Sequence, residues 1–265
     1  MSARLITSRD NPLFKQLREL ANSTQARRQT GRTLLEGVHL CEVYVQQVGM
    51  PRLCIVGESA QTNPEVEAIA RRCETSGAAC IVLPDALYAA LSQVEHGVPL
   101  LFLIDTPLAV ANLPLQQSAL LLDNLQDPGN LGSILRTAAA SGIKAVFCSP
   151  GTANAWAPKV LRAGMGAHFA LTIIENVDLG EVIAASSVPT IATCPRAQIR
   201  LYDVDLKGPV AWLFGHEGQG VRPELLAQAS QQVTIPQTKS SESLNVAASV
   251  AVCLFEQMRQ GLFKP

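Results

Sequence analysis

The sequence predicts an α/β protein of two domains: a mostly parallel sheet with helices on both faces, preceded by a small α/β domain. Three observations carry this prediction. The chain has 265 residues, which is more than one average domain. Short apolar runs alternate with helical patterns along its second half, as in parallel sheets covered on both faces. Residues 106–118 interrupt this pattern with proline and glutamine, which is typical of a linker.

Residues 1–105 are expected to form the small α/β domain. Apolar runs predict strands, and helical periodicity predicts helices between them. The predicted strands are Leu53–Val56, Cys80–Leu83 and Pro99–Ile104. The predicted helices are Val38–Gln47, Pro64–Glu74 and Asp85–Gln93.

Residues 119–265 are expected to form the larger domain, in which strands alternate with helices. The predicted strands are Ala119–Asp123, Lys144–Cys148, Phe169–Ile173, Pro189–Ala192, Val210–Phe214 and Gln232–Ile235. Sheets of this kind bind ligands at the carboxyl ends of their strands, so polar residues at those ends are the first candidates for a site.

Composition excludes several classes of protein. Apolar residues make up 48% of the chain and charged residues 16%, which suits a buried core and not general disorder. The seven cysteines form no CxxC pair and are odd in number, so they are interpreted as core residues rather than as a zinc site or a disulfide framework. The start lacks the apolar segment of a signal peptide, and no apolar run reaches membrane-spanning length, so a cytoplasmic location is expected.

The amino-terminal stretch is basic, although the whole chain carries a net charge of −1. Residues 1–35 hold seven basic residues against two acidic ones. A solvated helix face and a phosphate-binding arm both explain such a run, and composition does not choose between them. The second interpretation makes Arg27, Arg28 and Arg32 candidate RNA-binding residues.

The first of three polar clusters follows the predicted strand Ala119–Asp123 and reads DNLQDPGNLGSILRTAAA. Asn130 suits the N-cap of the helix, and a Pro-Gly pair suits the turn before it. Neither role explains Arg136. Because helical side chains lean toward the amino terminus and Gly132 offers no obstruction, Arg136 is expected to reach back toward the loop.

The second cluster, VAWLFGHEGQGV, joins a predicted strand to Gly215, Gly218 and Gly220, with Glu217 among them. Glycine after a strand lets the backbone approach a ligand closely. The spacing is neither the dinucleotide fingerprint nor a P-loop. A plain connection would explain the glycines, but the acid within the turn favours a site. No second ligand is spaced to join His216 in a metal site.

The third cluster lies in VTIPQTKSSESLNVAASVAVCLFEQM, residues 233–258. A strand ends at Pro236, and a polar loop enters a helix that is apolar on nearly all sides and is therefore predicted to be buried. Ser241 or Ser243 can cap this helix. Asn245 lies in its first turn and needs hydrogen-bond partners, either in a capping network or at a ligand.

In this order and at these strand ends, the clusters resemble the three motifs of the SpoU (TrmH-type) RNA 2′-O-ribose methyltransferases, of the SPOUT class. The motifs are matched by Asn124, Asp127-Pro128, Asn130, Gly132 and Arg136; by Phe214-Gly215-His216-Glu217-Gly218; and by Ile235-Pro236 with Glu242-Ser243-Leu244-Asn245-Val246. The similarity is strong over residues 118–260. SRDNPLFKQLREL and LLEGVHL resemble the substrate-binding module of longer members more loosely.

The resemblance implies methylation of a ribose 2′-hydroxyl in RNA with S-adenosylmethionine as cofactor, and a trefoil knot at the carboxyl end of the sheet. The implied cofactor-binding residues are Phe214, Gly215, Ile235, Pro236, Leu244 and Asn245. The implied catalytic residues are Asn130, Arg136, Glu217, Ser243 and Asn245. For Arg136 two roles stay open: the base proposed for the family, or a cation that grips the neighbouring phosphate, since guanidinium is effectively always protonated.

The two-domain layout resembles members that act on ribosomal RNA, so ribosomal RNA is the expected substrate, with transfer RNA open. A base methyltransferase of the same class and a non-catalytic RNA-binding protein are the alternatives. No metal is expected. A homodimer is expected, because the apolar helix Leu244–Met258 needs to be covered on both sides and the sheet covers only one. Cover by the amino-terminal domain, in a monomer, is the competing explanation.

Overall fold

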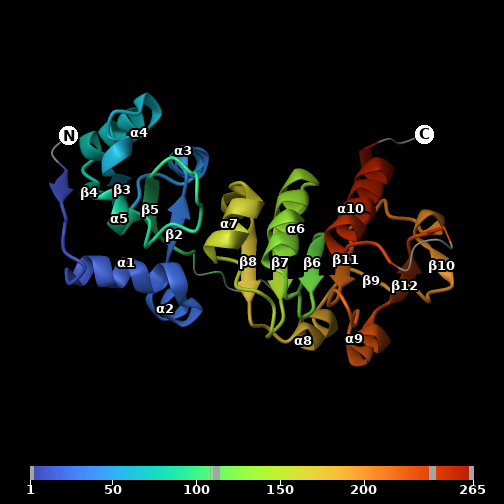
Figure 1. The fold of residues 1–265 in the computed structure, drawn as a ribbon. Coiled ribbons are helices and arrows are strands. Elements are labelled where there is room, and N and C mark those ends of the chain that lie inside the picture. Colours follow the sequence, from blue (N-terminus) through green and yellow to red (C-terminus); the bar gives the residue numbers. More distant parts are fainter. Residues whose placement is uncertain (1–2, 108, 110–113, 239–242, 263–265) are drawn as a thin grey trace. The chain divides into compact units, whose positions relative to one another are not determined.

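The structure is a computed structural model that describes residues 3–107, 109, 114–238 and 243–262 (Figure 1). Contacts divide the chain into two compact units. The first unit holds residues 1–108 together with 156–169, and the second holds 109–155 with 170–265.

The first unit is a five-stranded mixed sheet of order β1-β4-β3-β5-β2 with helices around it. Its strands are β1 Arg4–Leu5, β2 Arg32–Glu36, β3 Leu53–Gly57, β4 Ala79–Leu83 and β5 Leu100–Asp105. Its helices are α1 Pro12–Asn22, α2 Thr24–Thr30, α3 Val38–Gln47, α4 Pro64–Thr75, α5 Asp85–Tyr88 and α7 Pro158–Gly164, with a 3₁₀ turn at Glu58–Ala60.

The basic amino-terminal stretch folds into α1, α2 and β2, none of which the apolar patterns had marked. Asn11 caps α1 by accepting a hydrogen bond from the Leu13 amide at 2.9 Å. The helix then buries Phe14, Leu17 and Ala21, whose spacing places them on one face. Of the basic residues in this stretch, Lys15 and Arg18 lie on this amphipathic helix, whose apolar face covers a core, whereas Arg27, Arg28 and Arg32 lie on α2 and β2.

The second unit is built on a seven-stranded sheet of order β10-β12-β9-β11-β6-β7-β8, in which every pairing is parallel. Its strands are β6 Ala119–Leu122, β7 Ala145–Cys148, β8 Thr172–Glu175, β9 Thr190–Thr193, β10 Ile199–Arg200, β11 Ala211–Phe214 and β12 Gln231–Thr234. Its helices are α6 Pro128–Ala140, α8 Leu179–Ala184, α9 Pro223–Gln228 and α10 Val246–Leu262, with a 3₁₀ turn at Leu201–Asp203.

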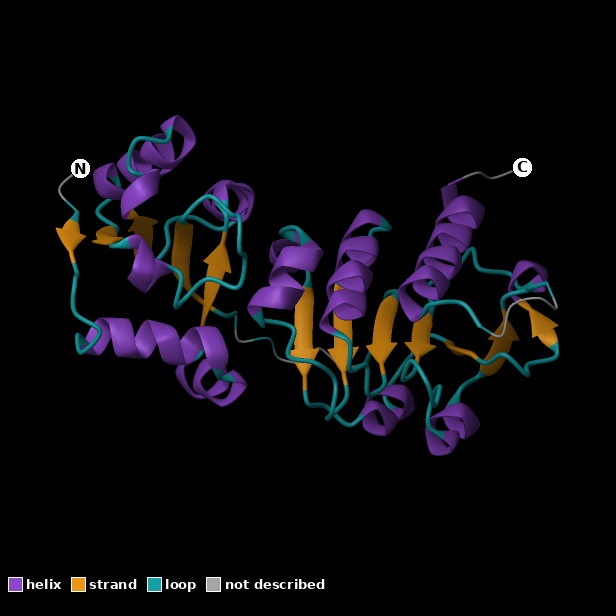
Figure 2. Cartoon of the chain, viewed as in Figure 1, coloured by secondary structure: helices purple, strands orange, loops and turns teal. Residues whose placement is uncertain are grey.

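Both faces of this sheet are covered, as the sequence predicts. Figure 2 shows α6 and α10 on one side of the strands and α8 and α9 on the other. Leu121 and Leu213 pack in the cluster under α8 and α9, while their neighbours Leu120 and Trp212 are equally buried. Consecutive residues of one strand are thus buried on opposite faces, which produces continuous apolar runs such as ALLL.

Strand order reverses between β6 and β11. From β6 the chain continues to β7 and β8 on one side, whereas β11, β9, β12 and β10 lie on the other. Parallel sheets of this kind form a ligand-binding crevice at the carboxyl ends of the strands beside the reversal. The polar clusters at residues 123–130 and 215–220 follow β6 and β11 directly.

Two strands of this unit differ from the prediction. The strand expected at Phe169–Ile173 is β8, Thr172–Glu175, because Ala167–Ala170 forms a 3₁₀ turn first. The short edge strand β10 was not predicted, since two exposed residues leave no apolar run.

Residues 156–169 were expected in the larger domain, and in the structure their contacts group them with the first unit. The Thr33 hydroxyl donates to the Trp156 carbonyl at 2.7 Å, and Arg162 pairs with the buried carboxylate of Glu36 at 3.3 Å. No helix in the described ranges is long and apolar enough to span a membrane.

Candidate active site at the carboxyl ends of β6, β11 and β12

Asp127, and not Asn130, is the N-cap of α6. Its carboxylate accepts a hydrogen bond from the Asn130 amide at 2.7 Å, and Pro128 occupies the first helical position. The expectation that Asn130 caps the helix is therefore wrong. Because Asp127 satisfies the helix terminus, the side chain of Asn130 is available for contacts elsewhere.

A chain of hydrogen bonds joins the three polar clusters. The Glu217 carboxylate accepts from the Asn130 side-chain amide at 3.1 Å and from the amides of Asp127 at 3.1 Å and Gln126 at 3.3 Å. The Asn130 side-chain oxygen accepts from the Asn245 side-chain amide at 3.0 Å. Three segments remote in sequence are thus fixed against one another, and this set is called the Glu217–Asn130–Asn245 chain below.

Asn245 also caps α10. Its side-chain oxygen accepts from the Ala247 amide at 2.8 Å and from the Ala248 amide at 3.4 Å. Of the caps predicted for this helix, Ser243 lies just before it in the loop, and Ser241 falls outside the described residues, as does Glu242 of the third motif. One residue therefore both starts the helix and orients Asn130, because its amide group donates and accepts at the same time.

Glu217 is held as a carboxylate. Partial burial raises the pKa of Glu217, but the hydrogen bonds from its own backbone, from Asn130 and from the amides of Asp127 and Gln126 outweigh this effect and lower it below the ordinary value. The group therefore carries negative charge at neutral pH and acts as an acceptor for donors on α6.

The glycine-rich turn after β11 is closed by tight contacts. A Cβ atom on Gly215 would lie 2.1 Å from the Val221 amide nitrogen, so only glycine fits there. The His216 ring accepts at Nδ1 from the amides of Gly218 at 2.9 Å and Gln219 at 3.2 Å. His216 consequently organises the turn that presents Glu217, a role that the sequence left open.

Asp123 is a buried member of the site that sequence reasoning missed. It follows β6 directly, is 0% exposed, and accepts from the Arg222 amide at 3.0 Å and the Arg222 Nε at 2.9 Å. Ser149 also donates to it at 3.2 Å. The pair fixes the end of the glycine-rich turn to the end of β6. The sequence pattern that could have identified Asp123 is an acidic residue directly after an otherwise apolar strand, because a buried acid needs partners.

A cavity of about 650 Å³ lies beside this network. Most of the predicted cofactor-binding residues line it, namely Phe214, Gly215, Ile235 and Leu244, together with Ser243. Pro236 is exposed, and Asn245 serves the hydrogen-bond chain instead. The volume lies within the usual range of small-molecule sites. The apolar side chains of Val233 and Val246 at the wall, beside the backbone of Gly215, suit the implied cofactor, S-adenosylmethionine.

Arg136 lies on the exposed surface of α6. Within the part of the chain that the structure describes, its guanidinium has no hydrogen-bond or ion-pair partner. The structure therefore does not bring Arg136 into the Glu217–Asn130–Asn245 chain. Its charge is unpaired, which suits a group that meets an anion from outside the fold.

The predicted RNA-binding residues of the first unit separate into two kinds. Arg27 is 5% exposed and donates to the Leu20 carbonyl at 2.7 Å and the Thr24 hydroxyl at 2.8 Å. Its assignment to RNA is corrected, because its donors satisfy the carboxyl end of α1. Arg28 is exposed, and Arg32 is partly exposed beside Asp105 at 3.5 Å.

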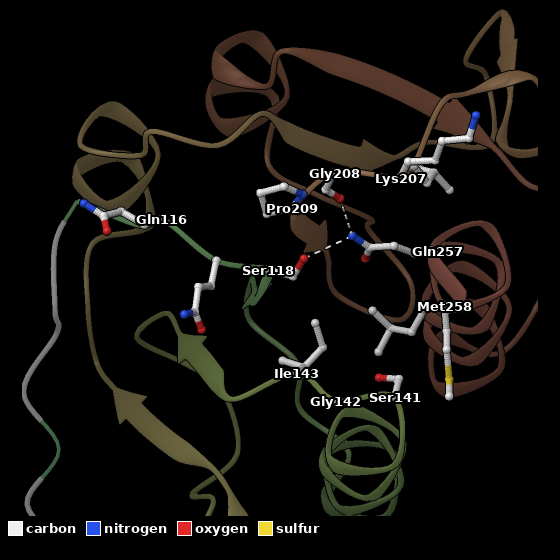
Figure 3. Close-up of a pocket in the computed structure, with 14 residues that line it drawn as sticks. Gln116, Ser118, Ser141, Gly142, Ile143, Lys207, Gly208, Pro209, Gln257 and Met258 are labelled. Atoms are coloured by element: carbon white, nitrogen blue, oxygen red, sulfur yellow. Dashed lines mark hydrogen bonds between the residues drawn. The ribbon is translucent and has the colours of Figure 1, made fainter. Parts of the chain in front are cut away.

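A second cavity, of about 490 Å³, lies at the opposite, amino-terminal ends of β6, β7 and β11 (Figure 3). Gln257 of α10 donates there to the Ser118 hydroxyl at 3.0 Å and the Gly208 carbonyl at 2.9 Å, as Figure 3 shows. These bonds attach α10 to the beginnings of two strands. Lys207 is the cation of this cavity, and none of the three polar clusters contributes to it.

Possible metal ligands are dispersed among the described residues, and the thiols of Cys148 and Cys253 are buried. No group of three His, Cys, Asp or Glu side chains there is placed to hold a metal ion. Burial raises the pKa of the Cys148 and Cys253 thiols, which keeps them protonated and unreactive at neutral pH.

Comparison with known proteins agrees with the geometry. Residues 117–255 match the family model described as the SpoU rRNA methylase family. An uncharacterised tRNA/rRNA methyltransferase of Synechocystis is 36% identical, covering 96% of this chain and 93% of the relative. The 23S rRNA (guanosine(2553)-2′-O)-methyltransferase of Bacillus subtilis is 27% identical, covering 94% and 97%. The structure of an rRNA methyltransferase from Sinorhizobium meliloti with AdoMet bound superimposes with a TM-score of 0.85, at 26% identity over 99% of each chain.

Proposed function

The chain belongs to the SpoU rRNA methylase family and is an S-adenosylmethionine-dependent RNA ribose 2′-O-methyltransferase, and from this premise we propose that its substrate is ribosomal RNA. The relatives that resemble it along nearly their whole length support this choice, because the one from Bacillus subtilis is a 23S rRNA methyltransferase. Such a substrate would place the enzyme in the cytoplasm. Transfer RNA is the second candidate, since the Synechocystis relative is described as a tRNA/rRNA methyltransferase.

Cofactor binding is assigned to the 650 Å³ cavity. The bound cofactor would supply a methyl group already activated by a sulfonium. The residues proposed to hold it are Gly215, Ile235 and Leu244 through their backbone, with Phe214 at the wall, while Pro236 only follows Ile235 after the end of β12. In the proposal the loops after β11 and β12 thread as a trefoil knot, which would fix these segments in one bent arrangement.

The protein's remaining task is to align the ribose hydroxyl and stabilise charge as its proton leaves. We assign the developing negative charge on the 2′-oxygen and the neighbouring phosphate to Arg136, as a permanent cation and not as a base. Its exposed, unpaired guanidinium supports this role. Ser243, at the cavity wall, is proposed to orient the incoming ribose.

The single observation that carries the proposal is the Glu217–Asn130–Asn245 chain. It joins residues 87 and 115 positions apart by hydrogen bonds of 3.1 and 3.0 Å, at the strand ends that form the cavity. A structural capping network would need only Asn245 and the helix amides. The additional link through Asn130 to Glu217 instead orders the loop before α6 against the glycine-rich turn, which a reaction site requires and a plain connection does not.

Transfer of a labelled methyl group to separated RNAs tests the proposal. Ribosomal and transfer RNA from a host lacking the modification are incubated with the protein and labelled S-adenosylmethionine, and nucleosides are then analysed. Label in a 2′-O-methylnucleoside from ribosomal RNA is expected. Label in a methylated base would indicate the base-modifying alternative, and no label despite cofactor binding would indicate a non-catalytic RNA-binding protein.

The proposed RNA-binding residues of the first unit are Arg28 and Arg32, and the proposed assembly is a homodimer. Support for the dimer comes from α10. Its inner face buries Val250, Cys253 and Leu254, whereas Phe255 on the other face is 47% exposed. An exposed phenylalanine in an apolar helix is typical of an interface.

A further inference from the structure

A surface outside the network lies along residues 195–203, called the edge segment below. It leaves the carboxyl end of β9, where Arg196 lines the 650 Å³ cavity. It continues through β10, the outermost strand of the sheet, which contains Ile199 and Arg200. It ends in the 3₁₀ turn that carries Tyr202.

The edge segment is held in place by its backbone and its buried neighbours. The Cys194 amide donates to the Val233 carbonyl at 2.9 Å, and β10 pairs in parallel with β12. Leu201 is fully buried, and Gln260 of α10 donates to the Val204 carbonyl at 3.1 Å. The exposure of the side chains between these anchors is therefore a fixed feature of the surface and not the result of a loose loop.

The exposed side chains are unusual for this chain. Tyr202 is 56% exposed, whereas Tyr44 and Tyr88 are 7% and 6% exposed. Ile199 is 41% exposed. Within the described ranges, the guanidinium groups of Arg196 and Arg200 have no side-chain or backbone partner. An aromatic ring and unpaired guanidinium groups on one short segment suit single-stranded RNA, which offers base faces and phosphates.

We propose that the edge segment binds single-stranded RNA adjacent to the methylated nucleotide, with Arg200 on a phosphate and Tyr202 stacked on a base. The inference rests on the proposed function and extends it to the recognition of the substrate. Arg196 at the cavity and Tyr202 are six residues apart, so they are separated by at most about 20 Å. The segment is therefore short enough for RNA that enters the cavity to reach both ends.

Charge along the segment agrees with this occupant. The one acid of the segment, Asp203, ends it directly after Tyr202, and Asp205 beyond it accepts from the Lys207 amide at 3.1 Å in a turn of its own. The residues between the cavity and Tyr202 carry positive charge only. An acidic protein surface could meet the same cations, but the exposed aromatic ring beside them offers a face on which an RNA base can stack.

The test measures the binding of a fluorescein-labelled, mixed-sequence, single-stranded RNA of about 20 nucleotides, by anisotropy at several salt concentrations. Tyr202→Ala is expected to weaken binding roughly 5- to 100-fold, and Tyr202→Phe is expected to preserve it, because the stacking face remains. Arg200→Ala is expected to reduce the slope of log affinity against log salt by about 0.7. The affinity of each variant for S-adenosylmethionine should equal that of the wild type.

Lys207→Ala is the matched control, since it removes one cation from the same unit at the opposite ends of the strands. It should change neither RNA affinity nor the salt slope. Unchanged RNA binding in both Arg200→Ala and Tyr202→Ala would overturn the inference. Failure of the proposed function would be a different result. The wild-type protein would then transfer no methyl group to ribosomal RNA, while the variants would still lose RNA binding. In that case the edge segment would be an RNA-binding surface of a protein without that activity.

Discussion

At the scale of single residues, the site depends on side chains that carry two roles at once. Asn245 caps α10 and also donates to Asn130, while Glu217 accepts from Asn130 and from two backbone amides. Because these contacts are shared, removing one partner leaves another polar group without its bond. Effects of substitution at this level should therefore appear in stability as well as in activity.

Glu217→Gln should make the free energy of unfolding depend less on pH in the acid range. Hydrogen bonds lower the pKa of Glu217 in the folded state despite its partial burial, so the carboxylate stabilises the fold above the pH range where a free carboxyl titrates. That contribution is lost as the pH falls through the lowered pKa. Denaturant unfolding measured between about pH 6 and pH 3 should show a smaller loss in the variant than in the wild type.

Glu19→Gln makes the same charge change on the exposed surface of α1 and serves as the control for this measurement. An identical acid dependence in the wild type and in Glu217→Gln would contradict the assignment of Glu217 as a stabilising carboxylate.

Arg136→Ala should lower kcat by about 10²- to 10³-fold, the usual effect of removing one group that stabilises developing charge. Because Arg136 is exposed and unpaired among the described residues, the melting temperature and the affinity for S-adenosylmethionine should stay close to those of the wild type. Arg136→Lys separates geometry from charge. A lysine variant with most of the activity would indicate a point charge, and an inactive one would indicate bidentate contact with phosphate.

At the scale of elements, the turns that follow the strands are fixed by close backbone contacts and by hydrogen bonds from side chains. The turn after β11 has its first glycine against the backbone of Val221 and its last at φ 74°. The strand end of β6 is fixed to the same turn by Asp123 and Arg222. The sequence identified the glycines as a place of close approach, but the atom approached is the protein's own backbone.

Gly215→Ala should destabilise the protein and abolish cofactor binding. The added Cβ would lie 2.1 Å from the Val221 nitrogen and 2.2 Å from the Gly220 carbonyl carbon, so backbone must move, at a cost of roughly 1–3 kcal/mol or more. Calorimetry with S-adenosylmethionine and thermal unfolding measure both effects. Gly218→Ala is the control, because its Cβ would find its nearest atom at 3.7 Å. Equal behaviour of the two variants would contradict this account.

Arg27→Ala should reduce the free energy of unfolding by about 1–3 kcal/mol, because it leaves the Leu20 and Ala21 carbonyls at the end of α1 without this donor. RNA affinity measured under conditions where the variant is folded should be unchanged. Arg28→Ala is the control at the neighbouring position. Because Arg28 is exposed, this change should leave the free energy of unfolding close to that of the wild type while weakening RNA binding. Unchanged stability together with weaker RNA binding in Arg27→Ala would instead indicate that Arg27 binds RNA.

At the scale of the whole molecule, the sequence predicted the parallel sheet and the three clusters because buried strands and glycine-rich turns leave periodic and compositional signals. It did not predict β10, whose two residues are exposed, α1, whose charges concealed an apolar face, or α2, which buries only Ala26 and Arg27. Asp123 was missed because its partner Arg222 is 99 residues away, and no local pattern records a contact of that range.

The homodimer is tested at the outer face of α10. Ala248, Ala251 and Phe255 recur at steps of three or four residues and so share one side of the helix, where Phe255 is 47% exposed; Leu244, in the loop just before the helix, is 38% exposed. A two-fold axis would cover this stripe with its own copy.

Light scattering at low micromolar concentration should give twice the chain mass of 28.3 kDa. Phe255→Asp should give a single chain, because a charge buried without a partner opposes the interface. Val48→Asp places the same charge on a 55% exposed valine of the first unit and should remain dimeric. A wild-type mass of one chain, with methyl transfer intact, would instead favour the monomer in which the stripe is covered from within the chain.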